Sequence, residues 1–160
     1  MASSTLNIKK ILRCKKTQGI FMLPHTVSLR ELVKKAYEKG VGAVLITGDD
    51  SKCVGIITER DIMRCCAKGL DFDHVTAREV MCDKLIVVKM DDDINHAMDV
   101  MIKSNIRHLP VVSDKGLEGI VTIRDLIQAI RQSDQEEIEE FVKYLQSHLT
   151  HHKAADKSCS

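Results

Sequence analysis

The stretch that decides the fold is Gly55-Ile-Ile-Thr58-Glu-Arg60-Asp61-Ile62, which occurs a second time as Gly119-Ile-Val-Thr122-Ile-Arg124-Asp125-Leu126. The second copy lies 64 positions downstream, from 58 to 122. An apolar pattern upstream also recurs, as Leu29-x-x-Leu32-Val33-x-x-Ala36 and then Ile94-x-x-Ala97-Met98-x-x-Met101. Two patterns repeated in the same order predict two copies of one structural unit.

Each copy has the same order of predicted elements. In the first half Ser28 and Glu31 form a capping box that begins a helix, and Gly40 ends it. Apolar runs predict strands at 43–47 and 53–58, and a second helix follows at 59–68. The second half repeats this order as a strand at 85–89, a helix at 94–104, strands at 108–112 and 118–122, and a helix at 123–132.

The order β-α-β-β-α, found twice, predicts an α+β fold of two pseudo-symmetric units. Helices would cover only one face of each sheet, so we expect the two units to pack through their sheets. We place the first unit at 8–70 and the second at 71–132, with a short helical turn capped by Thr76 in the connection between them.

Beyond the repeat, Ser133 and Glu136 predict the start of a separate amphipathic helix at 133–149. Its apolar stripe contains Ile138, Phe141, Val142, Leu145 and Leu149. The final residues, 150–160, are predicted to be disordered.

The composition excludes several classes of protein. The chain has 160 residues, a formal net charge of +1 and 3% aromatic residues, so neither a basic field nor stacking side chains point to nucleic acid. No apolar run approaches the roughly 18 residues that span a bilayer. The N-terminal residues are basic and free of acids, as in a mitochondrial presequence, but Ile8, Ile11 and Leu12 fit the start of the folded domain. We predict a cytoplasmic protein without membrane contact.

The six cysteines, at positions 14, 53, 65, 66, 82 and 159, have no CxxC spacing. We predict buried or half-buried reduced thiols, with redox sensing as the alternative. Four metal-ligating residues near the C-terminus fall in the predicted disordered tail, so no metal site is predicted: His148, His151, His152 and Cys159. The sequence also lacks the G-x-S-x-G, H-E-x-x-H, P-loop and Rossmann motifs, so we predict that the chain is not an enzyme and requires no cofactor.

The repeated unit, which closes in Gly-Ile-x-Thr-x-x-Asp, resembles the CBS (cystathionine-β-synthase) domain. Further matches are Val41-Gly42-Ala43 and Ile106-Arg107-His108-Leu109-Pro110-Val111, and the resemblance covers residues 8–132. The segment Ile57-Thr58-Glu59-Arg60-Asp61 is similar to small stand-alone CBS-pair proteins. In this family two units form a Bateman module, and the clefts between them bind AMP, ADP, ATP, S-adenosylmethionine or NAD(H).

The resemblance implies where a nucleotide would bind. Asp61 and Asp125 would accept hydrogen bonds from ribose hydroxyls, and Thr58 and Thr122 would contact phosphate. Backbone groups around 42–44 and 107–109 would read the adenine edge. The expected binding residues of these two segments are Gly42, Ala43, Arg107, His108, Leu109 and Pro110.

The candidates for neutralising phosphate are Arg60, Arg107, His108 and Arg124. Because Arg107 and His108 lie in the same half as Asp125, the second motif is expected to contribute more to binding. Two positions depart from the family pattern: Arg124 stands where relatives often have Gly, and Cys82 where they have Thr. The first difference bears on phosphate contacts in the second half, and the second removes a hydroxyl donor near the connection.

The spacing Thr-x-x-Asp has two interpretations. At the start of a helix that follows a strand, free backbone N–H groups and the helix dipole favour phosphate, and the Asp side chain faces the same space. The same spacing is also that of a helix capping box. Spacing alone leaves both interpretations open, and the resemblance favours the nucleotide.

The function predicted from the sequence is a regulatory module that binds an adenine nucleotide and acts as a homodimer on an unidentified partner protein. The alternative is a structural or interaction protein whose clefts stay empty and which works through its C-terminal helix.

Overall fold

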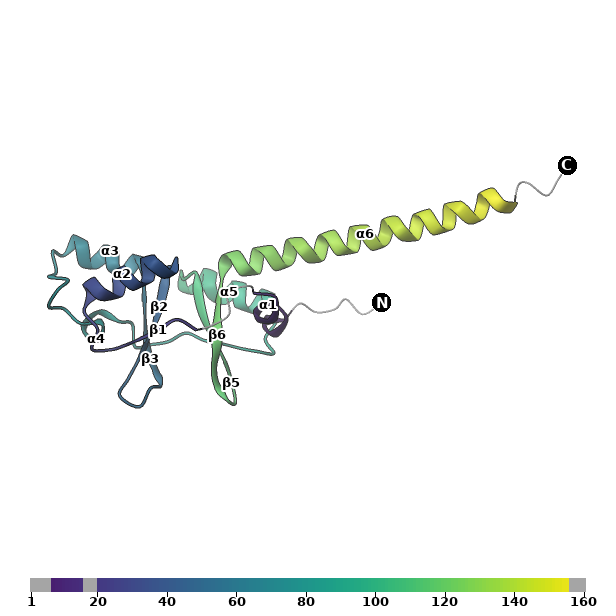
Figure 1. Ribbon diagram of the computed structural model, residues 1–160. Helices are drawn as coiled ribbons and strands as arrows, with labels where there is room; N and C mark the ends of the chain where they lie inside the picture. The colour runs from purple at the N-terminus through teal and green to yellow at the C-terminus, as the bar shows by residue number, and fades with distance from the viewer. Residues whose placement is uncertain (1–6, 16–19, 156–160) are drawn as a thin grey trace.

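The computed structural model consists of two units side by side and a long helix that leaves the second unit (Figure 1). It describes residues 7–15 and 20–155, with side chains up to residue 143. Each unit contains a three-stranded sheet in which a short parallel strand precedes an antiparallel pair. The first sheet is β1 (Met22–Pro24), β2 (Ala43–Thr47) and β3 (Cys53–Thr58), and the second is β4 (Val88–Lys89), β5 (His108–Ser113) and β6 (Gly116–Thr122). The predicted α+β fold is confirmed.

The helices begin and end at the residues that their capping patterns predict. Helix α2 (Leu29–Lys39) starts where Ser28 Oγ accepts a hydrogen bond from the Glu31 N–H at 3.3 Å. It ends at Gly40, whose φ of 65° lies in the left-handed region. Its counterpart α5 (Ile94–Ser104) is capped by Asp93. Helix α3 (Glu59–Ala67) follows β3 directly, and the short α4 (Ala77–Val80) begins at Thr76.

The predicted strand at 85–89 is wrong in its first part. Only Val88 and Lys89 pair with β5. Leu85 and Ile86 instead line a cleft between the units, and Ile86 is 42% exposed. These apolar side chains therefore form part of a cleft wall. An apolar run in the sequence does not by itself distinguish a cleft wall from a strand.

The predicted unit boundaries need a correction because each unit is completed by a segment from across the chain. Helix α1 (Ile8–Cys14) packs into the core of the second unit, where Ile8 is fully buried. Its first N–H donates to the Asp92 carbonyl at 3.0 Å. Conversely, α4 packs into the core of the first unit through the fully buried Ala77. The range 8–70 was assigned to the first unit, but α1 at its start belongs to the core of the second unit. The range 71–132 was assigned to the second unit, but α4 near its start belongs to the core of the first.

Two repeated glycines make room for these crossing segments. A Cβ atom on Gly55 would lie 2.5 Å from Met81 Sδ and 3.1 Å from the Cys82 carbonyl oxygen. A Cβ atom on Gly119 would lie 3.0 Å from a Leu12 methyl group. The glycine that opens each motif is therefore required by close packing of the connection or of α1 against the adjoining strand.

Helix α6 (Ile123–Ala155) is continuous, so the boundary predicted at residue 133 is wrong. No Gly or Pro interrupts these 33 residues, and a serine within a helix costs only a few tenths of a kcal/mol relative to better helix formers. Residues 150–155, predicted to be disordered, belong to this helix, and 156–160 lie outside the described residues. At about 1.5 Å per residue α6 is about 50 Å long, and it extends well beyond the two units (Figure 1). None of the described helices is long and apolar enough to cross a membrane.

Candidate functional site

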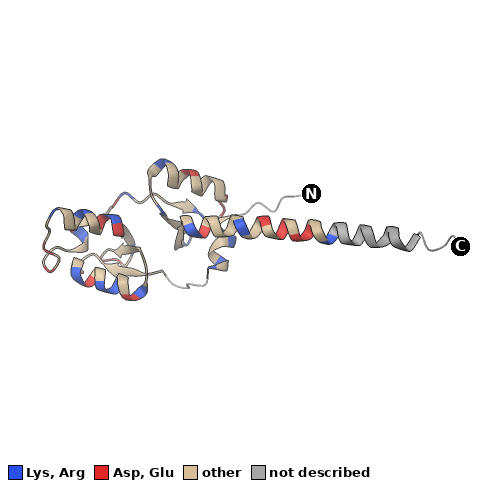
Figure 2. Ribbon diagram, turned by 90° about the horizontal axis from the view of Figure 1, so that it is seen from above, with Lys and Arg blue, Asp and Glu red and all other residues tan. Residues whose placement is uncertain are grey.

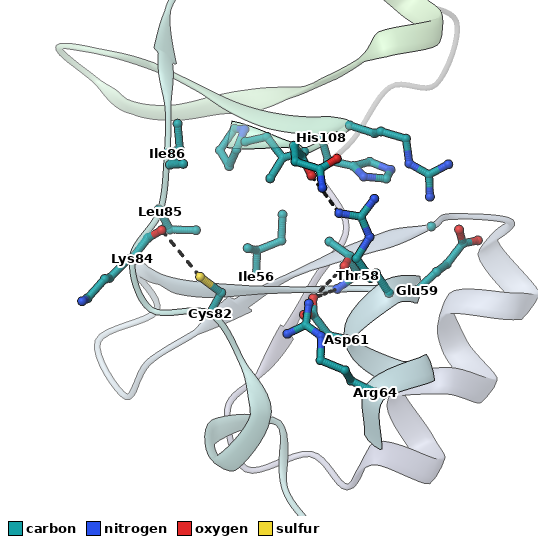
Figure 3. A pocket seen from close by; sticks show the side chains of 16 residues that line it. Ile56, Thr58, Glu59, Asp61, Arg64, Cys82, Lys84, Leu85, Ile86 and His108 are labelled. Atoms are coloured by element: carbon teal, nitrogen blue, oxygen red, sulfur yellow. Dashed lines mark hydrogen bonds and ion pairs between the residues drawn. The ribbon is translucent and has the colours of Figure 1, made fainter. Parts of the chain in front are cut away.

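Two clefts lie between the units, and each combines the Thr-x-x-Asp motif of one unit with the start of a strand from the other. The first has a volume of about 230 Å³. Thr58 and Asp61 come from the first unit, and His108 faces them from the second (Figure 3). Pro110 of the second unit also lines this cleft. The connection between the units closes one side through Cys82, Lys84, Leu85 and Ile86.

Asp61 holds the start of α3 in a capping box. Its Oδ2 accepts from the Thr58 N–H at 2.8 Å and from the Thr58 hydroxyl at 2.6 Å. Its Oδ1 lies 3.3 Å from the Arg64 guanidinium, whose side chain is 64% exposed. The motif therefore forms a helix capping box, as one of its two interpretations predicted. The same Asp61 carboxylate also lines the cleft.

Positive charge exceeds negative charge in the first cleft. Four basic side chains line it (Arg60, Arg64, Lys84 and Arg107), against two acidic ones (Glu59 and Asp61). Arg60 is positioned across the two units because its Nη1 donates to the Asn105 carbonyl at 2.8 Å. Most of the remaining wall is apolar and consists of Ile56, Leu85, Ile86, Ile106 and Pro110. A ligand with an apolar or aromatic part and an anionic part fits this arrangement.

His108 lies at both clefts, at the start of β5. Burial lowers its pKa from the ordinary value of 6.5, and the nearby Arg107 charge lowers it further. Glu59 acts in the opposite direction but does not outweigh them. The ring is therefore neutral at pH 7 and can both donate and accept a hydrogen bond.

The second cleft is larger, at about 520 Å³, and is built by the pseudo-symmetric elements. Thr122 and Asp125 from the second unit face Gly42 and Ala43 from the first. Two basic and two acidic side chains line it, so it has no excess of positive charge: Lys15, Lys39, Glu118 and Asp125.

Asp125 makes the same capping box as Asp61 and one further interaction. Its Oδ2 accepts from the Thr122 N–H at 2.8 Å and the Thr122 hydroxyl at 2.9 Å. It also accepts from Lys15 Nζ at 2.7 Å. Burial alone would raise the pKa of Asp125, but the hydrogen bonds and the charge of Lys15 outweigh burial, so the pKa is lowered. Asp125 is a carboxylate at neutral pH.

The structure brings most of the predicted binding residues to these clefts. The first cleft contains Gly42, Thr58, Arg60, Asp61, Arg107, His108 and Pro110, and the second contains Gly42, Ala43, His108, Thr122 and Asp125. Two predicted residues do not line either cleft. The Leu109 side chain is fully buried in the core of the second unit, which does not bear on the predicted role of its backbone, and Arg124 lines a hollow along α6 with Ile127 and Arg131.

The expectation that Arg107 and His108 serve Asp125 is corrected for Arg107 only, because His108 lines the cleft of Asp125 as well as that of Asp61. Arg107 lies in the cleft of Asp61, because the strand start of one unit faces the motif of the other. Sequence reasoning missed Lys15, which precedes both repeats, and Asn105, the left-handed residue that ends α5. The apolar run at 85–87 was a signal for the cleft wall that was assigned to a strand instead.

The described cysteines differ in their exposure to solvent. Among the described cysteines, Cys65 is buried and Cys53 half-buried, as predicted, whereas Cys14, Cys66 and Cys82 are exposed. Burial raises the pKa of the Cys65 thiol, which favours its protonated form. No group of three or more metal-ligating side chains occurs among the described residues. The tail histidines and Cys159 lie outside the described side chains.

Comparison with known proteins identifies the family. The family model for the CBS domain matches residues 15–68 and 77–132, so the chain belongs to the CBS domain family as a tandem pair. An uncharacterized protein of Methanopyrus kandleri is 40% identical over 100 residues, which are 61% of this chain and 51% of that protein. A mitochondrial CBS domain-containing protein of Arabidopsis thaliana is 33% identical over 121 residues, which are 72% of this chain and 59% of that protein. The chain thus spans little more than half the length of these relatives.

Solved structures agree with this assignment. A protein with CBS domains from Burkholderia ambifaria has 28% identity and a TM-score of 0.74, covering 78% of this chain and 93% of that one. A CBS domain protein of Pyrobaculum aerophilum, solved with AMP, has 30% identity and a TM-score of 0.67 over 75% of this chain and 89% of that one. The CBS domain pair of protein MJ0100, solved with 5-methylthioadenosine and S-adenosyl-L-methionine, has 28% identity and a TM-score of 0.68 over 80% of this chain and 98% of that one. CBS pairs with this fold therefore include proteins that bind adenosine compounds.

Proposed function

We propose that this chain is a regulatory module whose first cleft binds an adenine nucleotide: AMP, ADP, ATP or NAD(H). The observation that carries the proposal is the combination, in one cleft, of the Asp61 carboxylate with an excess of basic side chains and an apolar wall. The adenosine compounds bound by the Pyrobaculum and MJ0100 relatives support it. A catalytic role has no such support in the site, and a cytoplasmic location remains a prediction.

Each part of a nucleotide has a complementary part of the first cleft. Asp61 would accept from the ribose hydroxyls, and the adenine ring would pack against Ile56 and Ile86. The basic side chains Arg60 and Arg107 would neutralise the phosphate. Guanidinium groups suit this purpose because they present planar, bidentate donors.

The proposed regulation follows from the origin of the cleft walls. The lining residues come from the first unit, the second unit and the connection at 82–86. A ligand that contacts all three prefers one relative orientation of the units and shifts the population toward it. A partner protein that contacts both units would respond to this orientation.

Exposed apolar side chains support the proposal that the module is a homodimer. Tyr37 and Ile102 are 86% and 67% exposed, at matching positions on α2 and α5. Met63 and Ile127 are 72% and 49% exposed, at matching positions on α3 and α6. Four helices thus each present a large apolar side chain to solvent, and burial in a second copy would remove them from water.

A second candidate function is supported by one observation on α6. Beyond the body of the protein, Ile138 and Phe141 are 64% and 61% exposed. Five acidic residues occur near them, between positions 134 and 140. Figure 2 shows acidic residues on the part of α6 that extends beyond the two units. An interaction role through this helix, with both clefts empty, is the alternative to nucleotide sensing.

A thermal-shift panel separates the two functions. We expect AMP, ADP, ATP or NAD(H) to stabilise the protein by about 2.7 kcal/mol at about 100 times Kd. For a chain of this size that gain raises Tm by about 5–10 °C. Absence of any shift with these ligands and with S-adenosylmethionine at millimolar concentration would refute nucleotide sensing and favour the interaction role.

A further inference from the structure

Lys15 lies outside the repeat and lines the second cleft but not the first. Lys15 follows α1, and its Nζ bridges Asp125 Oδ2 at 2.7 Å and the Ile120 carbonyl at 2.9 Å. Lys15 precedes the first repeat, but α1 carries it to the second unit and into the second cleft. The motif aspartate of that cleft therefore already has an ammonium partner from the protein itself.

The Lys15–Asp125 pair is shielded from solvent. The two side chains are only 22% and 18% exposed. Solvent and salt screen such a pair less than an exposed one. Breaking it without replacing the partner leaves a charge in a partly buried site, which is costly. A ribose diol entering the second cleft must compete with this ammonium for Asp125, and a ribose hydroxyl carries no charge to replace it.

Asp61 has no comparable partner. The Thr58 N–H and hydroxyl occupy its Oδ2 just as those of Thr122 occupy Asp125 Oδ2. The only cation paired with Asp61 among the described residues is Arg64, at 3.3 Å and on a largely exposed side chain. Exposed pairs of this kind are worth little, so a ligand displaces Arg64 at small cost. The second cleft has the larger volume. Whether a ribose reaches its aspartate depends, however, on the cation already paired with that aspartate.

We propose that Lys15 acts as an internal plug of the second cleft, which means that its ammonium group pairs with Asp125 and excludes the ribose. Each chain therefore binds one adenine nucleotide, in the first cleft only. This inference rests on the proposed function. It makes Lys15 a specificity-determining residue, because it distinguishes two motif aspartates that the repeat makes equivalent. Replacing Lys15 should open the second cleft to the same ligand.

The test is the stoichiometry of AMP binding measured by isothermal titration calorimetry. We expect one AMP per chain for the wild type and two for Lys15→Met, which keeps the length of the side chain and removes the ammonium. Asp61→Asn in the wild-type background should weaken the single site about tenfold. In the Lys15→Met background the same change should leave one site unaltered. Lys10→Met is the matched control, because Lys10 is exposed on the same helix, and it should keep one site.

The outcomes separate the inference from the proposed function. Two sites in the wild type, or one site in a folded Lys15→Met variant, overturn the plug while leaving nucleotide binding in place. A single wild-type site that Asp61→Asn does not weaken also overturns it, and this arm does not depend on the folding of the Lys15 variant. If AMP binds neither the wild type nor Lys15→Met, both proposals are overturned. If AMP binds Lys15→Met but not the wild type, the plug is supported and binding in the first cleft is refuted.

Discussion

Replacing Asp61 by Asn separates the two roles that the structure gives this side chain, as a helix cap and as a wall of the first cleft. Asp61 Oδ2 accepts two hydrogen bonds from Thr58, at 2.8 and 2.6 Å. An asparagine has a side-chain carbonyl oxygen that can accept the same two bonds. The capping box is therefore expected to survive, whereas the negative charge is lost.

The effect on stability should be small. Loss of the charge removes its favourable interaction with the helix dipole, which is typically worth about 0.3–1 kcal/mol. The pair with Arg64, which is 64% exposed, adds little. At about 2–4 °C per kcal/mol for a chain of this size, Tm should fall by about 1–4 °C.

The effect on binding should be larger. Charge-assisted hydrogen bonds are roughly twice as strong as neutral ones. Weakening the contact between the ribose and residue 61 accordingly should raise Kd for AMP about tenfold, which corresponds to about 1.4 kcal/mol.

Calorimetric titration with AMP and a thermal melt measure the two effects on the same samples. Asp93→Asn is the matched control, because Asp93 caps α5 through a 2.9 Å bond from the His96 N–H and lines neither cleft. It should lower Tm slightly and leave Kd unchanged. If Asp61→Asn binds AMP as the wild type does, while Asp61→Ala only lowers Tm, the motif is a cap and the ribose does not contact it.

Four further predictions test the packing, the charges and the assembly. Ile8→Ala should lower the free energy of unfolding in urea by about 2–5 kcal/mol, because Ile8 is fully buried in the core of the second unit. A loss below about 1 kcal/mol would contradict the packing of α1 against that unit. Because burial lowers the pKa of His108 from 6.5, the unfolded chain takes up a proton there more readily than the folded chain, so stability should fall as the pH drops below about 6.5. His108→Gln should lose less stability than the wild type between pH 7.5 and 5.5, and an identical pH dependence would show that His108 is not the cause. Arg107→Gln should weaken AMP binding roughly fivefold, about 1 kcal/mol for an exposed charge, and reduce its salt dependence, which titrations at two salt concentrations check. Light scattering should give a mass near twice 18.0 kDa, and Met63→Lys should shift it toward the monomer, whereas a stable wild-type monomer at micromolar concentration refutes the helix-mediated dimer.

The sequence alone determined the architecture of this protein, because its signals are local. The repeated Gly-Ile-x-Thr-x-x-Asp segment predicted two copies of one unit, and the structure contains them. Ser28 and Gly40 marked helix ends correctly, since capping depends on residues within one turn of the end. Where the local signal was ambiguous the prediction was wrong: Ser133 resembled a cap but lies within α6.

The tertiary structure decided which residues share a cleft. The packing of the units places Arg107 beside Asp61, although the two residues belong to different copies of the repeat. It also carries Lys15 to Asp125, a separation of 110 residues along the chain. Contacts of this kind arise from how the two units meet and from a helix that crosses between them, and no spacing within either repeat encodes them. The repeat makes the two motifs alike, and the N-terminal segment, which lies outside the repeat, makes the two clefts different.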